Sequence, residues 1–413
     1  MAAQLSQCQL SQCEDNSPAL AAAAHVPIVA QRSRAPEPAK AHRDPVPLKA
    51  RSSDLDSFGK PDAPPTGVFS FREARKILGD LFVHRAVVYW ADMLITLAVG
   101  YGFAYVYLNT PAFSLLQIAS FLISGFALFR VGSFIHEITH LRQGELLAFR
   151  VAWNIFAGIP MLMPSFFYEN HIDHHNGHRY GTIRDGEYLQ LGRGSRWKLL
   201  WFWLQVPVLP LYIYVRLLIV SPISFLHPRL RKWALERMSS FVINFRHRLD
   251  VPESAPRKAW AALELACCLR AVALAILLFA GLKPWTHGLQ LYFLALMTLG
   301  LNYIRNMVAH HYRNAGKEMT FLEQLDDSVN ITGGPILTEL FFPLGLRFHA
   351  LHHLFPSLPY HNLGVAHRRL MAALPADSPY RRTVYRSFWS VIHELWNDPA
   401  RRENRFEQQA EAA

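Results

Sequence analysis

Eleven of the 20 histidines fall in four short clusters whose spacing suits metal binding. The first cluster has two histidines four residues apart, and two others combine separations of three and four residues. The clusters are His136 and His140; His171, His174, His175 and His178; His310 and His311; and His349, His352 and His353. Residues three or four apart lie on one face of a helix, so each helical cluster would direct its imidazoles to one side.

The number of imidazoles indicates a centre with two metal ions. Imidazole binds zinc, copper, iron and nickel, so the spacing alone does not name the metal. A single zinc ion takes about four ligands, whereas these clusters offer enough for two ions from segments far apart in the sequence. The four cysteines lack zinc-site or ferredoxin spacing, so histidine must hold the metal.

Long apolar runs predict an integral membrane protein. Four runs are long enough to cross a hydrocarbon core of about 30 Å. They are 86–108, 112–135, 259–281 and 286–308. Very short connections join the first run to the second and the third to the fourth. The predicted fold is therefore all-α, with four transmembrane helices in two hairpins and a cytosolic, histidine-rich metal-binding cap.

Basic residues predict the orientation of these helices. Residues 229–258 contain eight Lys or Arg, whereas the two hairpin turns together contain only Lys283. Because basic residues concentrate in cytoplasmic loops, we expect both termini and all the histidine clusters in the cytosol. The protein is expected to be a multi-pass protein of a bacterial inner membrane.

The remaining segments divide the chain into three regions. Residues 1–66 are rich in Ala, Pro and Ser and are predicted to be disordered. Residues 67–378 form the membrane domain, in which 146–168 and 199–226 are expected to be interfacial or re-entrant, because prolines and Arg216 disfavour a straight lipid-facing helix. Residues 379–413 are predicted to be an amphipathic interfacial helix followed by a polar tail.

The histidine clusters resemble the three boxes of the membrane fatty acid desaturase and hydroxylase superfamily. The matching segments are His136-Glu-Ile-Thr-His140, His171-Ile-Asp-His174-His175 and His349-Ala-Leu-His352-His353. Asn306-Met-Val-Ala-His310 is similar to a further segment of acyl desaturases that supplies a ninth histidine and a water-holding asparagine. The segment from His353 to Leu363 looks like that of bacterial-type fatty acid desaturases.

The resemblance implies a di-iron centre. Its ligands would be His136, His140, His171, His174, His175, His310, His349, His352 and His353, with Asn306 reaching one iron through water. Other groups must fix the orientation of such imidazoles, and the candidates are Glu137, Asp173, His178, Asp326 and Asp327. Solvated or helix-capping carboxylates, and a loop position for His178, are the alternatives. Only one of the adjacent His310 and His311 is expected to coordinate.

The implied activity is O₂-dependent oxidation of a fatty acyl chain, with desaturation to a C=C bond as the first prediction. The alternatives are hydroxylation, or oxidative decarboxylation to a terminal alkene, on the same scaffold. A histidine-rich transporter is disfavoured because the histidines cluster beyond the ends of the spans. No electron-carrier motif is found, so we expect an external donor such as ferredoxin or a b-type cytochrome with its reductase. The net charge of +11 suits an acidic donor or anionic membrane lipid, and no nucleic acid partner is expected.

Overall fold

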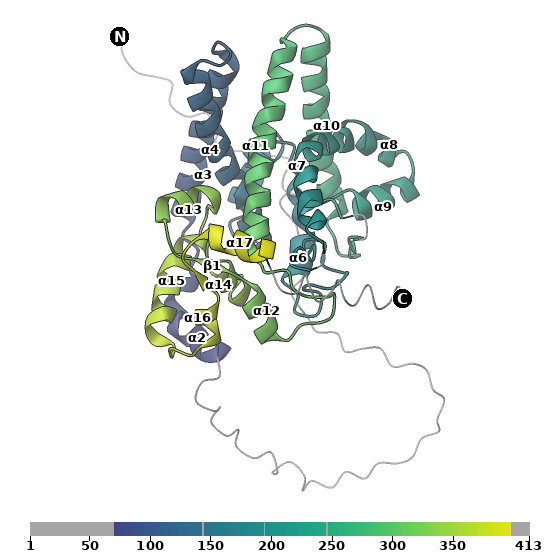
Figure 1. Cartoon of the computed structure of the whole chain (residues 1–413). Coiled ribbons are helices and arrows are strands. Elements are labelled where there is room, and N and C mark those ends of the chain that lie inside the picture. The colour runs from purple at the N-terminus through teal and green to yellow at the C-terminus, as the bar shows by residue number, and fades with distance from the viewer. Residues whose placement is uncertain (1–69, 143, 194, 245–246, 398–413) are drawn as a thin grey trace, which may run out of the picture.

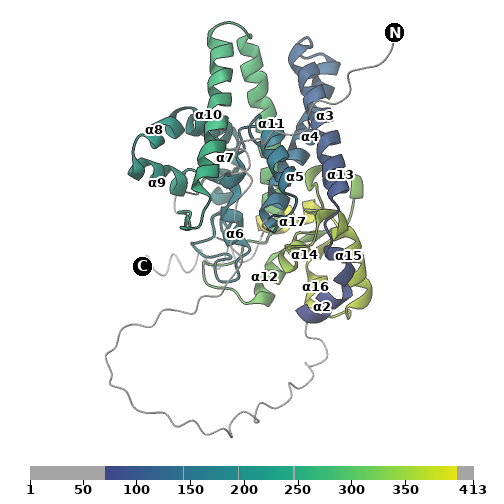
Figure 2. The ribbon, with the colours of Figure 1, turned by 180° about the vertical axis from the view of Figure 1, so that it is seen from behind.

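The structure is a computed structural model that describes residues 70–397, except 143, 194 and 245–246. The predicted disordered tail at 1–66 and the polar tail after residue 397 lie outside the described residues. Helices dominate the described part of the chain, and the strands β1 and β2 have only two residues each. Two pairs of long helices rise from a layer of short helices that gathers at their lower ends (Figures 1 and 2).

The four long helices follow one another in pairs. They are α3 (Ala86–Asn109), α4 (Leu115–His140), α10 (Arg257–Phe279) and α11 (Trp285–Ala309). Before α4, the Ser114 side chain accepts a hydrogen bond from the backbone N of Gln117 at 3.2 Å and caps the helix. Before α11, Pro284 marks the turn. α4 packs on both α3 and α11, and therefore occupies the centre of the bundle.

Four stretches are long and apolar enough to cross a membrane. They are Ala86–Asn109, Leu115–His140, Trp197–Phe225 and Arg257–Phe279. Three of these coincide with predicted spans. The fourth predicted span, 286–308, forms the continuous helix α11 but is less hydrophobic, because His287 and Gln290 lie near its start and Asn302, Arg305 and Asn306 near its end. Trp197–Phe225, which we expected to be interfacial, meets the criterion instead.

Arg216 does not interrupt that apolar stretch because its charge is paired. The stretch consists of α7 (Trp197–Val215), the π-helical turn η4 (Arg216–Val220) and α8 (Ser221–Phe225). The Arg216 guanidinium donates to Glu264 Oε1 of α10 at 2.7 Å, and both side chains are fully buried. Arg231 of α9 (Pro228–Arg237) donates to the other oxygen of Glu264 at 2.6 Å. An arginine with a carboxylate partner inside a bundle is far less costly than one that faces lipid.

The segment expected at 146–168 is only partly helical. It contains α5 (Leu147–Trp153), the π-helical turn η2 (Asn154–Gly158) and the 3₁₀ turn η3 (Ser165–Tyr168). The indole N–H of Trp153 donates to the carbonyl of Val131 at 2.7 Å and holds this segment against α4. No single helix crosses from residue 146 to residue 168, which agrees with the effect expected of Pro160 and Pro164.

The lower layer is assembled from short elements. They are α2 (Phe71–Ile77), η1 (Gly79–Phe82), α6 (Asn170–His174), α12 (Phe321–Asp327), α13 (Pro335–Phe341), α14 (His349–Leu354), α15 (Tyr360–Ala373), α16 (Pro379–Arg382) and α17 (Phe388–Asn397), with the strands β1 (Asn330–Ile331) and β2 (Val384–Tyr385). The two strands pair in parallel. This pairing connects the C-terminal segment to the chain between α12 and α14.

The structure corrects the single C-terminal helix that was predicted from residue 379. The chain instead forms α16, then β2, and only then α17. The cause is the pairing with β1, in which Val384 lies opposite Asn330 and takes the backbone out of the helical region. α17 keeps the expected amphipathic character, since Phe388 and Val391 are buried and the Trp389 side chain is exposed.

Candidate metal centre

Nine histidines from four parts of the chain converge where α4 and α11 meet the lower layer. Their elements place them by helical spacing, except that His310 follows the end of α11 in an extended conformation. They are His136 and His140 in the last turns of α4; His171, His174 and His175 in and directly after α6; His310; and His349, His352 and His353 in α14. These are the nine histidines that the family resemblance had selected.

The structure divides the nine side chains into two groups. Within each group, one ligand nitrogen from every member lies within 4.8 Å of the others. The five-histidine group is His136, His140, His171, His175 and His352, and the four-histidine group is His174, His310, His349 and His353. Adjacent residues therefore serve different groups, as with His174 and His175. The sequence predicted two ions but not how the boxes share them.

The geometry of both groups fits a metal. In the four-histidine group, His310 Nε2 lies 3.0 Å from His174 Nε2 and 2.9 Å from His349 Nε2. In the other, His352 Nε2 lies 3.2 Å from His140 Nε2 and 3.1 Å from His175 Nε2. Both ring nitrogens of buried His136 lack a hydrogen-bond partner among the described residues. Buried polar atoms rarely stay unpaired, and a metal ion would provide a partner for one of these two nitrogens.

The protonation state of most of these imidazoles favours coordination as well. Burial, reinforced by neighbouring imidazoles, lowers the pKa of His171, His175 and His310 well below the ordinary value. The same causes lower the pKa of His349 and His352. These rings are therefore neutral near pH 7, and a neutral ring nitrogen is what a metal binds. Burial opposes protonation of His174 also, but the Asp185 carboxylate outweighs it and raises the pKa of that ring.

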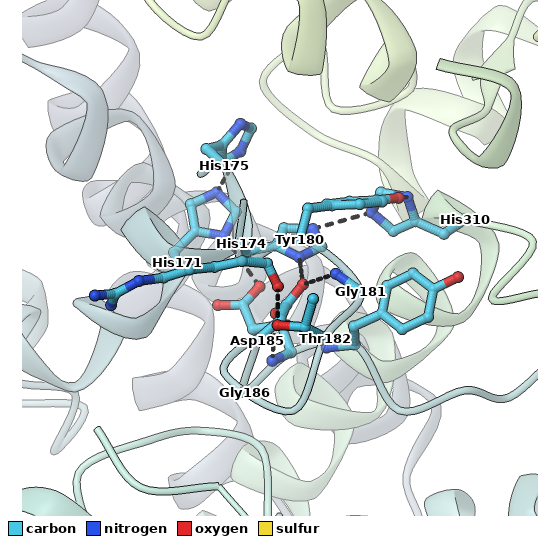
Figure 3. A network of polar contacts seen from close by, with 12 residues as sticks. His171, His174, His175, Tyr180, Gly181, Thr182, Asp185, Gly186 and His310 are labelled. Atoms are coloured by element: carbon cyan, nitrogen blue, oxygen red, sulfur yellow. Dashed lines mark hydrogen bonds and ion pairs between the residues drawn. The ribbon is translucent and has the colours of Figure 1, made fainter. Parts of the chain in front are cut away.

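Two carboxylates orient the second histidine box from a loop that follows it, and Figure 3 shows Asp185 of this loop beside His174. Asp185 Oδ2 lies 2.8 Å from His174 Nδ1, and Glu187 Oε2 lies 3.0 Å from His171 Nδ1. Each contact occupies Nδ1 and leaves Nε2 for the metal. Burial raises the pKa of Glu187 to about 7. Carboxylates in these positions fix the tautomer and rotation of a ligand imidazole.

A third contact involves a tyrosine. The Tyr180 hydroxyl lies 2.7 Å from His310 Nδ1 and 2.8 Å from Asp327 Oδ2, and so connects this imidazole to a buried carboxylate. Asp327 was among the sequence candidates, but Tyr180, Asp185 and Glu187 were not. They follow the second box in an irregular loop, for which neither helical spacing nor a motif provides a signal.

The other sequence candidates lie elsewhere. Glu137 accepts hydrogen bonds from Tyr89 and from the backbone N of Tyr360, and its carboxylate is 4.0 Å from His136 Nδ1. Asp173 pairs with Arg179 at 2.6 Å and Asp326 pairs with Arg382 at 2.9 Å, so neither orients a histidine. The side chain of His178 is 90% exposed. α6 ends at His174 and His175 caps it, so the helical spacing that would have brought His178 to the metal does not continue.

The end of α11 determines where the side chains of Asn306 and His311 lie. Asn306 lines a small cavity together with His174, His310 and His349, which is the position that the resemblance implied for a residue that acts through water. His310 forms an isolated bridge with Ser328, and successive side chains of extended backbone point to opposite sides. His311 accordingly turns away and its Nε2 lies 3.3 Å from the Tyr385 hydroxyl.

The contact of Asp185 gives a testable prediction. Its Oδ2 accepts from the backbone N of Gly181 at 3.0 Å as well as contacting His174, and its Oδ1 accepts from the backbone N of Glu187 at 3.0 Å. Asp185→Asn keeps the size of the side chain but removes its charge, and should lower activity or iron affinity about 10- to 100-fold. Asp326→Asn, a matched change in an exposed ion pair, should leave both unchanged. Equal effects of the two variants would contradict an orienting role for Asp185.

The chain is similar to known proteins in both its family profile and its overall sequence. The sequence profile described as "Fatty acid desaturase" matches residues 112–385, which contain all nine histidines. The chain belongs to the fatty acid desaturase family. It is also similar to a protein named "Ceramide hydroxylase" from Caulobacter vibrioides (strain NA1000 / CB15N), with 40% identity over 330 residues that cover 79% of this chain and 92% of that protein. No solved structure matches the chain.

Membership of this family makes the protein a membrane oxidoreductase of the non-haem di-iron desaturase and hydroxylase type. The two histidine groups are the residues that could bind its metal. The predicted superfamily and enzyme class are thereby confirmed. Hydroxylation, an alternative in the sequence analysis, is now supported at least as well as desaturation, which was the first prediction.

Proposed function

We propose that this protein hydroxylates the acyl chain of a ceramide-type lipid, using O₂ and electrons from an external carrier. The observation that carries the proposal is the 40% identity to a ceramide hydroxylase across 92% of that protein's length. In this reaction a C–H bond is replaced by C–OH. One oxygen atom of O₂ enters the lipid and the other leaves as water, with two electrons and two protons supplied from outside the lipid.

The nine histidines are proposed to hold two irons, one in each group. When bound, the irons would supply the activation of O₂ that oxidation of an unactivated C–H bond requires. Asp185 and Glu187 hold their imidazoles in one rotation and tautomer, and Tyr180 holds His310 in the same way. Asn306 lines the cavity of the four-histidine group, where its amide would hold a water.

An apolar cavity beside His136 is proposed to hold the acyl chain. It is a narrow, partly open space between α4 and α11, of about 490 Å³ when the solvent at its mouth is counted. Leu128, Phe129, Met161 and Met163 provide apolar walls. Apolar walls with a few polar groups are typical of sites for lipophilic ligands. The cavity orients the chain toward the histidines and excludes water from the carbon that reacts.

The orientation in the membrane is also part of the proposal. We place α3 with α4, and α10 with α11, as hairpins whose turns face away from the cytosol, with the histidine groups, both termini and the basic helix α9 on the cytosolic side of a bacterial inner membrane. α11 is included although it is less apolar, because Asn302, Arg305 and Asn306 face the cavities rather than lipid. α5 to η3 and α7 to α8 are proposed to enter the membrane from the cytosolic side and return to it.

Desaturation is kept as a second candidate because the profile that matches residues 112–385 is named for it. The experiment that separates the candidates uses purified protein in lipid nanodiscs, a ceramide, a reduced ferredoxin or cytochrome system and ¹⁸O₂. We expect a hydroxylated ceramide that carries the label. A product that has lost two hydrogens and gained no oxygen would support desaturation. With a free fatty acid in place of the ceramide, an unlabelled terminal alkene one carbon shorter, formed with release of CO₂, would support decarboxylation.

The cavity itself is tested by filling it. Gly132 of α4 lines the cavity, and a Cβ added there would lie 3.6 Å from the terminal methyl groups of Met161 and Met163. Gly132→Phe would place a ring in the space for the chain and should lower turnover roughly tenfold or more, because the chain could no longer lie in its reactive position. Iron content should stay at the wild-type level. The control is Gly102→Phe, because an added Cβ at Gly102 of α3 has no neighbour within 4 Å. Unchanged turnover of Gly132→Phe would exclude this cavity as the chain site.

A further inference from the structure

The apolar cavity changes from apolar to polar along its length. On α4 it is lined in order by Leu128, Gly132 and His136, and on α11 by Thr298, Asn302 and Arg305. Leu128 and His136 are eight residues apart, which corresponds to roughly 12 Å along a helix. Both helices run toward the histidine groups, so the apolar end of the cavity is distant from the histidines and the polar end adjoins them.

Arg305 occupies the polar end and lies between the two cavities. It lines the apolar cavity with His136 and also the small cavity with Asn306 and His349. Its side chain is 4% exposed. A bound molecule in either space would therefore meet this guanidinium close to the histidines.

The contacts of Arg305 leave its charge without a direct counterpart. Its Nε donates to Asn302 Oδ1 at 3.1 Å, and its Nη2 is 3.4 Å from the Tyr168 hydroxyl, a long contact. Among the described residues no carboxylate forms an ion pair with it. Glu187 lines the same small cavity and its charge interacts with that of Arg305 through space, but its Oε2 contacts His171 Nδ1 and forms no ion pair with Arg305. The contrast is Arg216, an equally buried arginine that is paired with Glu264 at 2.7 Å.

A buried guanidinium without a paired carboxylate is unfavourable unless another group compensates for it. A cavity that is apolar at one end and ends at such a cation is complementary to an amphipathic acyl compound. The chain would occupy the apolar end, and an oxygen of the acyl head would accept hydrogen bonds from the planar guanidinium, which suits carbonyl and carboxylate oxygens.

We propose that Arg305 binds the acyl carbonyl or carboxylate oxygen of the substrate and thereby directs oxidation to the first few carbons beside the head group. This inference rests on the proposed acyl-chain site and deepens it. The same chemistry is offered by the amide of a ceramide and by a free fatty acid. An oxygen held at Arg305 lies next to the histidine groups, so carbons near the head, rather than those in mid-chain, face the metal.

The first test needs no variant. Purified wild-type protein with an external donor is given a ceramide, a free fatty acid and a hydrocarbon of equal chain length, and the oxidised carbon is located by fragmentation mass spectrometry. We expect oxidation near the head of an oxygen-bearing substrate and poor turnover of the hydrocarbon. A preference for the ceramide or for the free fatty acid shows whether Arg305 binds an amide oxygen or a carboxylate oxygen. Oxidation in mid-chain, or equal use of the hydrocarbon, would overturn the proposal.

The second test changes Arg305 itself. Arg305→Met keeps length but removes charge and donors, and should lower kcat/KM about 10- to 100-fold, the loss expected for a hydrogen bond to a charged group. The loss should fall mainly on KM, and the oxidised position should spread along the chain. Arg305→Lys should restore part of the lost affinity and part of the selectivity for the oxidised position. Arg270→Met, in α10 and outside both cavities, is the matched control and should behave as wild type.

The outcomes separate this proposal from the proposed reaction. If the product is desaturated, hydroxylation fails, but the position of the new double bond still reports on Arg305. If Arg305→Met keeps the wild-type KM and oxidises the same carbon as the wild type, the binding role is excluded while hydroxylation stands. If Arg305→Met loses iron and thermal stability together, and the wild-type enzyme oxidises mid-chain, Arg305 has a structural role only.

Discussion

His352→Ala is expected to abolish turnover and to lower the iron content of the purified protein. The His352 ring is buried at the centre of the five-histidine group, with Nε2 3.2 Å from His140 Nε2 and 3.1 Å from His175 Nε2. Changing residues that merely orient ligands already costs 10- to 100-fold in affinity or activity, so loss of a ligand should cost at least about 100-fold. Iron is measured by mass spectrometry of the metal, and turnover by lipid analysis.

A buried histidine outside both groups provides the control for this change. His367 of α15 is buried, and its Nδ1 lies 2.8 Å from the Tyr380 hydroxyl. His367→Ala should retain iron, even if the protein becomes less stable, because its imidazole belongs to neither group. If His352→Ala kept wild-type iron and turnover, the five-histidine group would not be a metal site.

The adjacent residues His310 and His311 should differ sharply on mutation. His310 Nε2 faces His174 and His349 at 3.0 and 2.9 Å, whereas His311 Nε2 lies 3.3 Å from the Tyr385 hydroxyl. Both rings are buried, so burial alone predicts no difference. We expect His310→Ala to lose activity by at least about 100-fold and to lose iron from the four-histidine group. His311→Ala should keep iron and measurable turnover.

This comparison tests the geometry at the end of α11 rather than the family assignment. The two variants remove the same side chain from neighbouring positions and differ only in the side to which the extended backbone directs it. An essential His311 with a dispensable His310 would mean that the chain at this point is shifted by one residue relative to the structure.

Helical spacing made the histidine set predictable from the sequence. Pairs three or four residues apart, as in His136 and His140 or His349 and His352, lie on one helix face whatever else the fold does. His178 shows the limit of this reasoning, because its spacing predicts a contact only if the helix continues, and α6 ends at His174. The partition of His174 and His175 between two groups depends on how α4, α11 and α14 pack, which spacing does not encode.

The residues that orient the histidines were less predictable for a related reason. Asp185 and Glu187 reach His174 and His171 from a loop in which backbone N–H groups donate to the Asp185 carboxylate, and loops carry no periodic pattern. The prediction of membrane spans from the sequence has a different limit. Arg216 disfavours a straight lipid-facing helix at 199–226, but its charge is paired with Glu264, which lies 48 residues away on another helix. Charge pairing of this kind depends on tertiary structure that hydropathy does not report.

The metal content of the wild-type protein tests the central claim most directly. Protein purified from iron-replete cells should contain about two irons per chain, one for each histidine group, and little zinc. Mössbauer spectroscopy of iron-57-enriched protein should show that these irons form a coupled pair. Stoichiometric zinc with little iron, or a single isolated iron per chain, would contradict a di-iron oxygenase built from these nine histidines.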